Sequence, residues 1–341
     1  MSRVFHILVG VLATLIVVPM TVLTGQTPAT NRWKPPRTLD GQPDLQGVWS
    51  FATVTPLQRP SSLADKEVLG EEEAATFAAA QIRRQNRDLI DPKKGGANYP
   101  PESKGGVVPY NEFWYDRGTT VISTRRTSLI VDPPDGRIPP LTADGKRRAA
   151  ARAAGRGDTD GAGGRADWTT DRNLAERCIV GFNSGPPMMP SAYNNNVQIF
   201  QSREQVVIFN EMIHSARIVP VSARQAPPPN VPFLLGHSRG RWEADTLVVE
   251  TTNFTDKTAF QGSTKNLRLV ERFTRAGPDT LLYEFTVDDP STFERPWTAQ
   301  IPMSRLQGLI YEYACHEGNY GMEGILAGAR AQEKANQSRQ K

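Results

Sequence analysis

Apolar and polar residues alternate along much of the second half of the chain. The clearest case is the pair of segments Leu267–Arg275 and Thr280–Val287, which flank the turn residues 276–279. Successive side chains of a strand point to opposite faces, so the alternation gives each segment one buried and one solvated face. The pattern predicts an antiparallel hairpin.

Other short segments are rich in β-branched and aromatic residues and are bounded by turn residues, which is typical of strands. They are Thr119–Ser123, Thr127–Val131, Val197–Gln201, Val206–Val221, Arg239–Trp242, Thr246–Phe254, Trp297–Pro302 and Leu309–Tyr313. Two segments rich in Ala and Glu, Ala64–Arg87 and Met322–Ala335, predict helices. Many short antiparallel strands joined by turns predict a sandwich or a closed barrel.

The tripeptide Gly47-Val48-Trp49 favours the barrel. It resembles the Gly-x-Trp that opens lipocalin-like barrels, in which the Trp closes one end of the barrel. We therefore predict a mainly-β fold, with a single antiparallel, lipocalin-like β-barrel domain over residues 30–341 and a few peripheral helices.

The first 29 residues have the layout of a secretory signal peptide. Arg3 supplies a positive charge, residues 7–23 are almost wholly apolar, and small and polar residues follow up to a cleavage position at Ala29. The alternative is an uncleaved membrane anchor, because the apolar run is close to the shortest that spans a bilayer. In both cases we expect the rest of the chain to be exported, periplasmic or secreted, with no membrane contact beyond the signal segment.

The formal net charge is +4, and acidic and basic residues are mixed along most of the chain. This favours a protein that does not bind nucleic acid. Residues 143–168 contain a basic cluster, but its Arg residues alternate with Ala and lead into a run of Gly and Asp. We therefore expect a solvated helix that frays into a flexible, Gly-rich insertion, rather than a site for an anionic surface.

The two cysteines, Cys178 and Cys315, allow one intramolecular pairing. Exported proteins tend to oxidise their thiols, and this favours a disulfide between them. The alternative is a pair of buried free thiols.

Several longer motifs resemble a family of exported proteins from environmental bacteria. The motifs are TSLIVDPPDGRIPPL at Thr127–Leu141, YNNN at Tyr193–Asn196, EMIH at Glu211–His214, GRWE at Gly240–Glu243, ETTNF at Glu250–Phe254 and ACHEGNY at Ala314–Tyr320. The resemblance covers nearly the whole chain after the signal and implies that these motifs and both cysteines recur in relatives, but it brings no established activity. Relatives usually have Asp where this chain has His237, which weakens any role that needs an imidazole there.

Signatures of several enzyme classes are missing from the sequence: there is no Walker loop, GxGxxG, GxSxG, HExxH or zinc-type cysteine spacing. This argues against nucleotide enzymes, dinucleotide oxidoreductases, α/β-hydrolases and zincins. After the signal segment the histidines are His214, His237 and His316. Three interpretations stay open for them: ligands of a metal such as zinc, copper or iron, half-buried structural side chains, or a metal-free active site. The sequence assigns no cofactor.

In a metal-free active site, His214 or His316 would act as a general base beside Glu211 or Glu317. Arg217 would stabilise developing negative charge. On the strand predicted for this region, Glu211 shares a face with Arg217 while His214 points to the opposite face, unless a bulge intervenes.

A second group of candidates would bind a ligand through neutral hydrogen bonds and aromatic contacts. Its members are Tyr193, Asn194, Asn195, Asn196, Trp114 and Asp116. The alternative for the Asn run is a turn, because Asn tolerates positive φ and bonds its own backbone. Trp114 belongs to the aromatic cluster of residues 110–115, and Asp116 with Arg117 is expected at the mouth of a barrel cavity. Apolar cavities with a few polar groups are the usual form of small-molecule sites.

We therefore expect an exported barrel that binds, with or without transforming it, a small apolar or aromatic molecule. The first alternative is a hydrolase or lyase, metal-dependent or not, that uses His214 and His316 with their carboxylate neighbours. The second is a cell-envelope interaction protein without a small-molecule site. We consider this second alternative the weakest. Polar motifs are costly inside a barrel unless they are paired, and a protein without a small-molecule site has less reason to hold them.

Overall fold

The computed structural model describes residues 33–95, 101, 103, 111–156, 166–221, 227–228, 230–258 and 260–339. The predicted signal segment, residues 1–29, lies outside these ranges, as does Tyr110. The chain divides into two units, Met1–Lys34 and Pro35–Lys341, and all that follows concerns the second. Within the described ranges, no helix has the length and apolar character needed to cross a membrane.

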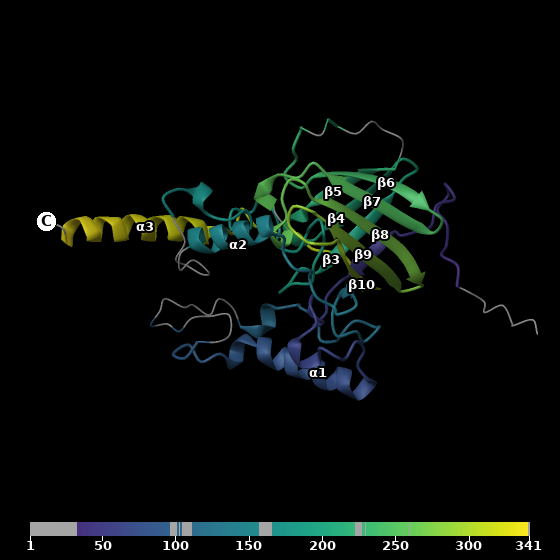
Figure 1. The fold of residues 1–341 in the computed structure, drawn as a ribbon, viewed down its shortest axis with the longest axis horizontal. Helices are drawn as coiled ribbons and strands as arrows, with labels where there is room; N and C mark the ends of the chain where they lie inside the picture. Colours follow the sequence, from purple (N-terminus) through teal and green to yellow (C-terminus); the bar gives the residue numbers. More distant parts are fainter. Residues whose placement is uncertain are drawn as a thin grey trace, which may run out of the picture. The chain divides into compact units, whose positions relative to one another are not determined.

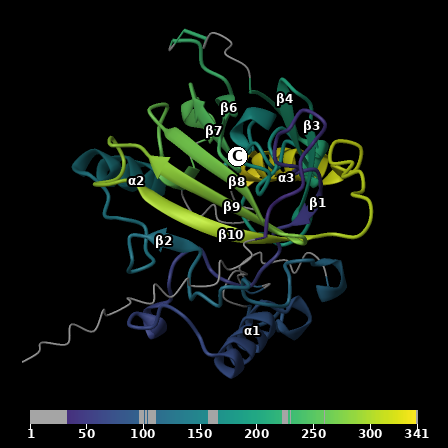
Figure 2. The same cartoon turned by 90° about the vertical axis from the view of Figure 1, so that its right-hand side faces the viewer.

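The second unit is mainly β, and nine of its strands form a nearly closed antiparallel barrel in the order β5-β4-β3-β1-β10-β9-β8-β7-β6 (Figures 1 and 2). The strands are β1 (Gly47–Ser50), β3 (Asn196–Gln201), β4 (Gln205–Asn210), β5 (Ala216–Pro220), β6 (His237–Glu243), β7 (Thr246–Thr252), β8 (Arg268–Gly277), β9 (Thr280–Asp288) and β10 (Trp297–Arg305). A short strand, β2 (Ile130–Asp132), pairs with β10 outside this path. The prediction of a mainly-β, barrel-like fold with a few helices is confirmed.

The two edge strands of the path, β5 and β6, pack closely enough to bring the sheet round on itself. At Gly240 of β6, an added Cβ would lie 2.8 Å from Val221 Cγ1 and 3.0 Å from Val219 Cγ1. A side chain at this position would collide with these valines of β5 and the residue after it, so glycine permits the close approach of β6 to β5.

The alternation of the sequence accounts for the longest strands. In β8 and β9 every second residue is buried, and the predicted hairpin forms with Phe273 opposite Tyr283. The inward side chains fill the barrel with a packed core that includes Trp49, Phe285 and Trp297. The interior is therefore largely occupied by the protein's own side chains.

Two predicted strands are wrong. Thr119–Ser123 forms bends, because its backbone bonds to the loop before it: Val54 N donates to Thr120 O, and Ile122 N donates to the Thr55 hydroxyl. Leu309–Tyr313 has no strand partner among the described residues, and Tyr311 N donates to a Glu211 carboxylate oxygen instead. The predicted strand Val206–Val221 is broken into β4 and β5 by a 3-10 turn at Met212–His214.

The barrel has two different ends. Hairpin turns at residues 201–205, 243–246 and 277–280 lie at one of them, the turn end. Here Trp49 is fully buried, its indole N–H donates to Leu45 O at 2.9 Å, and the guanidinium groups of Arg275 and Arg305 lie over its ring. The tryptophan of the Gly-x-Trp motif thus closes this end of the barrel.

Longer connections cover the opposite end, the loop end. They include residues 170–195, which lead into β3, and the connections from β7 to β8 and from β9 to β10. Met188 from the first of these is fully buried against the core. Its backbone N–H donates to the phenolic oxygen of Tyr283 at 3.0 Å, so the covering loop is bonded to a side chain inside the barrel.

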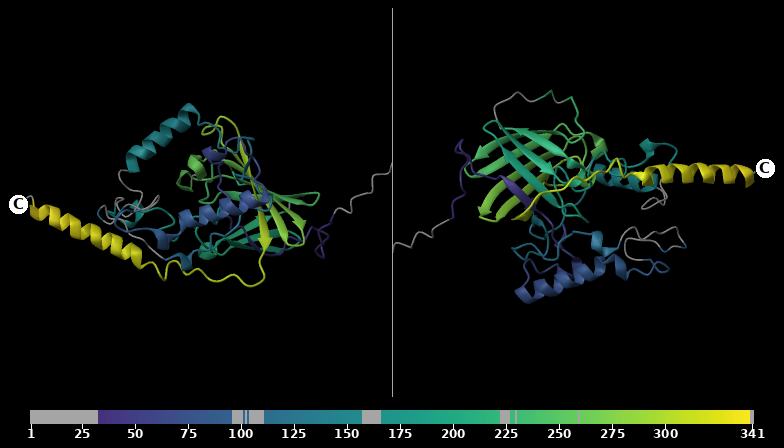
Figure 3. Two further views of the ribbon diagram at one scale, coloured as in Figure 1. Left: turned by 90° about the horizontal axis from the view of Figure 1, so that it is seen from below. Right: turned by 180° about the vertical axis from the view of Figure 1, so that it is seen from behind.

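The described residues form three α-helices: α1 (Glu71–Gln85), α2 (Ala143–Arg156) and α3 (Tyr320–Arg339). The first and last agree with the predicted helices, and α2 occupies the start of the predicted insertion 143–168. Within that insertion, residues 157–165 lie outside the described ranges. Between β10 and α3, residues 306–319 run back across the barrel strands rather than adding a strand to the sheet (Figure 3).

Candidate functional site

A pocket of about 840 Å³ lies at the loop end of the barrel. We call it the loop-end pocket. It is lined by Thr170, Arg172, Asn173, Leu174, Ala175, Arg177, Val180, Gly181, Phe182, Gly185, Pro186, Pro187, Met189, Leu235, Phe254, Lys257, Phe260 and Gln261. The volume falls within the range of about 300–1,000 Å³ that is common for small-molecule sites.

Aromatic and aliphatic side chains form a large part of this lining. Phe260 packs in a stacked arrangement on Trp297 and edge-on against Phe285, with ring centroids 6.0 Å apart in both cases, so this wall continues directly into the core. Phe182 differs, because 48% of its surface is exposed to solvent. An aromatic ring held half-exposed in a concavity offers apolar area that a ligand can cover.

Three basic side chains also line the pocket, and they differ in their partners. Arg172 is buried and makes a two-pronged ion pair with Glu176, with Nε and Nη2 donating at 3.0 and 2.9 Å. Among the described residues, neither Arg177 nor Lys257 forms an ion pair. The described lining contains no carboxylate and no imidazole, so these two cations are not neutralised from within the pocket wall.

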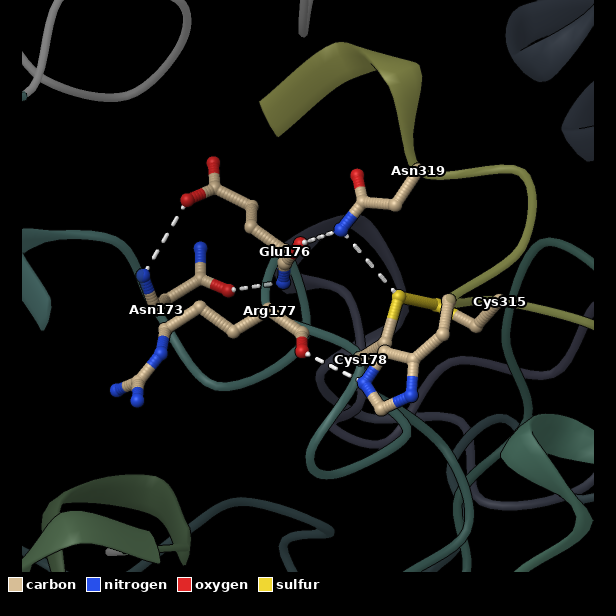
Figure 4. The surroundings of a disulfide bond; sticks show 7 residues. Asn173, Glu176, Arg177, Cys178, Cys315 and Asn319 are labelled. Carbon is tan, nitrogen blue, oxygen red and sulfur yellow. Dashed lines mark hydrogen bonds between the residues drawn. A yellow bond between two sulfur atoms is a disulfide. The ribbon is translucent and has the colours of Figure 1, made fainter. Parts of the chain in front are cut away.

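The wall segment that carries Arg177 is fastened to the C-terminal part of the chain (Figure 4). The predicted disulfide between Cys178 and Cys315 is formed. Beside it, Asn319 Nδ2 donates to Glu176 O at 2.8 Å, and a ring nitrogen of His316 lies 3.3 Å from Arg177 O. Figure 4 shows the Arg177 guanidinium directed away from this clamp, while the backbone on either side of it is held.

These contacts explain much of the ACHEGNY motif. Cys315, His316 and Asn319 act on the backbone of residues 176–178 and so position a wall of the pocket. His316 is exposed, and Glu317, also exposed, has no bond to it among the described contacts.

Among the other predicted catalytic residues, Glu211 and His214 lie in one turn, where His214 N donates to Glu211 O at 3.1 Å, but their side chains are not bonded to each other among the described contacts. His214 is exposed, in a turn where its φ is +39°. The Glu211 carboxylate is buried and accepts hydrogen bonds from Asn196 Nδ2 and Tyr311 N rather than from an imidazole. Arg217 points to the barrel interior, so the expectation that it lies alongside Glu211 fails because the 3-10 turn separates β4 from β5.

His237 lies on β6 beside Arg239, at a smaller surface pocket of about 370 Å³. Partial burial and the positive charge of Arg239 lower its pKa below the ordinary value. In the described part of the chain, no three His, Cys, Asp or Glu side chains gather in a group that could hold a metal ion.

Arg217 belongs to a buried polar network that the sequence pattern does not reveal. It pairs with Glu271, which is fully buried on β8, and Tyr283 donates to the same carboxylate at 2.7 Å. Burial and the adjacent charge of Glu271 hold the pKa of Tyr283 well above its usual value. The network joins β5, β8 and β9 across the barrel, and through Met188 it reaches the loop that lines the pocket.

Two of the three side-chain amides of the Asn run, those of Asn195 and Asn196, are bonded to other groups of the protein. Asn194 has a φ of +54°, which favours the turn interpretation. Asn195 is buried, and its amide bonds to Ser191 and to Asp116 O, while Asn196 bonds to Glu211. Tyr193 lies between Tyr115, Tyr313 and the pocket residue Phe182 in an aromatic cluster.

Trp114 and Asp116 lie outside the loop-end pocket. Trp114 is exposed and packs edge-on against Phe113. The pKa of Asp116 is raised by desolvation and by the negative charge of Glu211. The neighbouring Arg117 lines a separate pocket of about 480 Å³ beside α1.

Taken together, the fold and the pocket define a β-barrel protein with a loop-covered end and an aromatic, basic pocket at that end. No protein-family profile matches the sequence, and no curated protein matches it. The resemblance to an exported bacterial family therefore stays a prediction.

Proposed function

We propose that this protein is an exported binding protein that holds a small apolar or aromatic molecule in the loop-end pocket. The observation that carries the proposal is the solvent-exposed ring of Phe182 in a concave, largely apolar lining. Covering such a ring removes apolar area from water, which is the main driving force for binding small apolar ligands.

Export is supported by two features. The first is the signal-like composition of residues 1–29. The second is the disulfide between Cys178 and Cys315, since disulfides persist in oxidising compartments and are rare in the cytosol.

Binding rather than turnover is proposed because the described lining offers no carboxylate, imidazole or thiol for acid–base or nucleophilic chemistry. The exposed His214 and His316 each lack a carboxylate partner among the described contacts.

The test is a titration of the oxidised protein with phenylnaphthylamine, a neutral aromatic dye whose fluorescence rises in apolar surroundings. We expect saturable binding, and we expect Phe182→Ala to weaken it about fivefold, the value of one lost aromatic contact of about 1 kcal/mol. Phe200→Ala is the matched control, because Phe200 is 46% exposed but lies on β3 and not in the pocket lining.

A second variant, Leu235→Trp, fills the pocket and is expected to abolish binding while circular dichroism reports an unchanged fold. Equal affinities for Phe182→Ala and Phe200→Ala, or the absence of saturable binding, would overturn the proposal.

A further inference from the structure

We infer that the ligand of the loop-end pocket carries an anionic group, such as a carboxylate or sulfonate, which Arg177 and Lys257 bind. The inference rests on the proposed function, because it names the chemical class of the molecule that the same pocket takes.

The balance of charge in the lining carries the inference. The described lining holds three basic side chains and no acidic one, and the Arg172–Glu176 ion pair accounts for one of the three. The remaining two, Arg177 and Lys257, face a lining that otherwise consists mainly of apolar and backbone groups. An anion beside low-dielectric walls is attracted more strongly than one in open water.

The two cations come from two separate segments of the pocket lining. Arg177 belongs to the loop before β3, and Lys257 belongs to the connection after β7. The pocket brings both to the same concavity as the Phe182 and Phe260 rings. An amphipathic ligand, with an aromatic body and one negative group, matches this combination of groups.

Arg177 is also pre-organised. The disulfide at Cys178, the Asn319 bond to Glu176 O and the His316 contact with Arg177 O hold the backbone on both sides of it. A cation on a fixed backbone loses less conformational entropy when it binds, so a clamp of this kind benefits a binding residue.

The difference between Arg172 and Arg177 sharpens the assignment. Nε and Nη2 of Arg172 both donate to the Glu176 carboxylate, so Arg172 stabilises the wall of the pocket. Arg177 has no such acidic partner among the described residues, although it lies five positions further along the same segment. Lys257 is exposed, so we expect a smaller contribution from it than from the half-buried Arg177.

The test uses two dyes that differ by one sulfonate group: phenylnaphthylamine, which is neutral, and its sulfonated form, anilinonaphthalene sulfonate, which is an anion. We expect the oxidised full-length protein without its signal segment to bind the sulfonate more tightly. Arg177→Gln should weaken the sulfonate about tenfold and Lys257→Gln about threefold, with less than about a twofold change for the neutral dye. Added salt should weaken the sulfonate alone.

Arg203→Gln is the matched control, because Arg203 is an exposed cation in the β3–β4 turn, at the other end of the barrel. If both dyes bind equally and neither charge variant separates them, the anionic class is wrong while the proposed pocket stands. If neither dye binds, or if Phe182→Ala leaves both affinities unchanged, the proposed function itself fails.

Discussion

The backbone N–H of Met188 donates a hydrogen bond to the phenolic oxygen of Tyr283, at 3.0 Å. Tyr283 in turn donates to Glu271, which pairs with Arg217 from the opposite side of the barrel. A loop that lines the pocket is therefore bonded to a charged network inside the barrel. Changes in the network should therefore be felt at the pocket.

Removing only one partner of the buried Arg217–Glu271 ion pair should destabilise the protein strongly. Glu271→Leu leaves the Arg217 guanidinium unpaired in the barrel, and we expect it to lower the free energy of unfolding by about 3–5 kcal/mol. The double variant Arg217→Met with Glu271→Leu should recover most of this loss, because it removes both charges. Urea unfolding measures the free energy of unfolding of each variant. A double variant no more stable than the single one would contradict this prediction. Glu243→Gln, at an exposed pair with Arg241, serves as the control and should change little.

Tyr283→Phe removes the acceptor of the Met188 N–H while keeping the ring. We expect a loss of about 1–3 kcal/mol, the cost of leaving buried polar groups without a partner. Hydrogen exchange at the Met188 amide should become faster than in the unaltered protein. An unchanged exchange rate would mean that the bond does not hold the loop.

The carboxylate of Asp289 should contribute to acid sensitivity. Burial would raise its pKa, but hydrogen bonds from Ser291, Thr264 and Thr292 outweigh this and lower the pKa below the ordinary value of 3.8. A depressed pKa stabilises the folded protein above pH 3.8, and this stability is lost as the pH falls towards the folded-state pKa.

We therefore expect Asp289→Asn to be less stable than the unaltered protein at neutral pH, and the gap to narrow at pH values below 3.8. Urea unfolding across this pH range measures it, with the exposed Asp40→Asn as the control. A gap that stays constant with pH would show that the hydrogen bonds do not favour the charged form.

The disulfide should matter to both stability and binding. It closes a loop of 137 residues, for which the chain-entropy relation gives about 5 kcal/mol. Replacing both Cys178 and Cys315 with Ala should lower stability by up to this amount and weaken dye binding, because the wall at residues 176–178 loses its clamp. Urea unfolding and dye titration, each with and without reductant, separate the two effects. A variant that is less stable but binds dye normally would show that the clamp does not position Arg177.

Local patterns predicted the barrel well, because alternation and turn residues encode strands and hairpins directly. Strands β7 to β10 and the Gly-x-Trp plug follow from such patterns, and the disulfide follows from the two cysteines and the expected export. The two false strands share a physical cause: Thr119–Ser123 and Leu309–Tyr313 are β-branched or aromatic, but loop hydroxyls and a buried carboxylate take up their backbone groups. Propensity alone does not register that competition.

The pocket escaped prediction because its walls come from irregular segments without periodicity. Cys178, which lies close to Arg177 and Phe182 in the sequence, was the one feature that could have indicated this wall of the pocket. Lys257 and Phe260 join that wall only through tertiary packing. His214 and His316 were predicted as catalytic residues because of their residue type. In the structure, the His316 ring contacts a backbone carbonyl, and His214 is exposed. In the predicted Asn run, Asn195 and Asn196 likewise bond to other groups of the protein.

The most direct test of the central claim is photolabelling with an aromatic diazirine that bears a carboxylate, followed by mass mapping of the labelled peptides. We expect label on residues 172–189 and 254–261, with competition by anilinonaphthalene sulfonate and a marked loss of label in Leu235→Trp. Label concentrated instead on the outer face of β3–β5, where Phe200 and Ile218 are exposed, would contradict it.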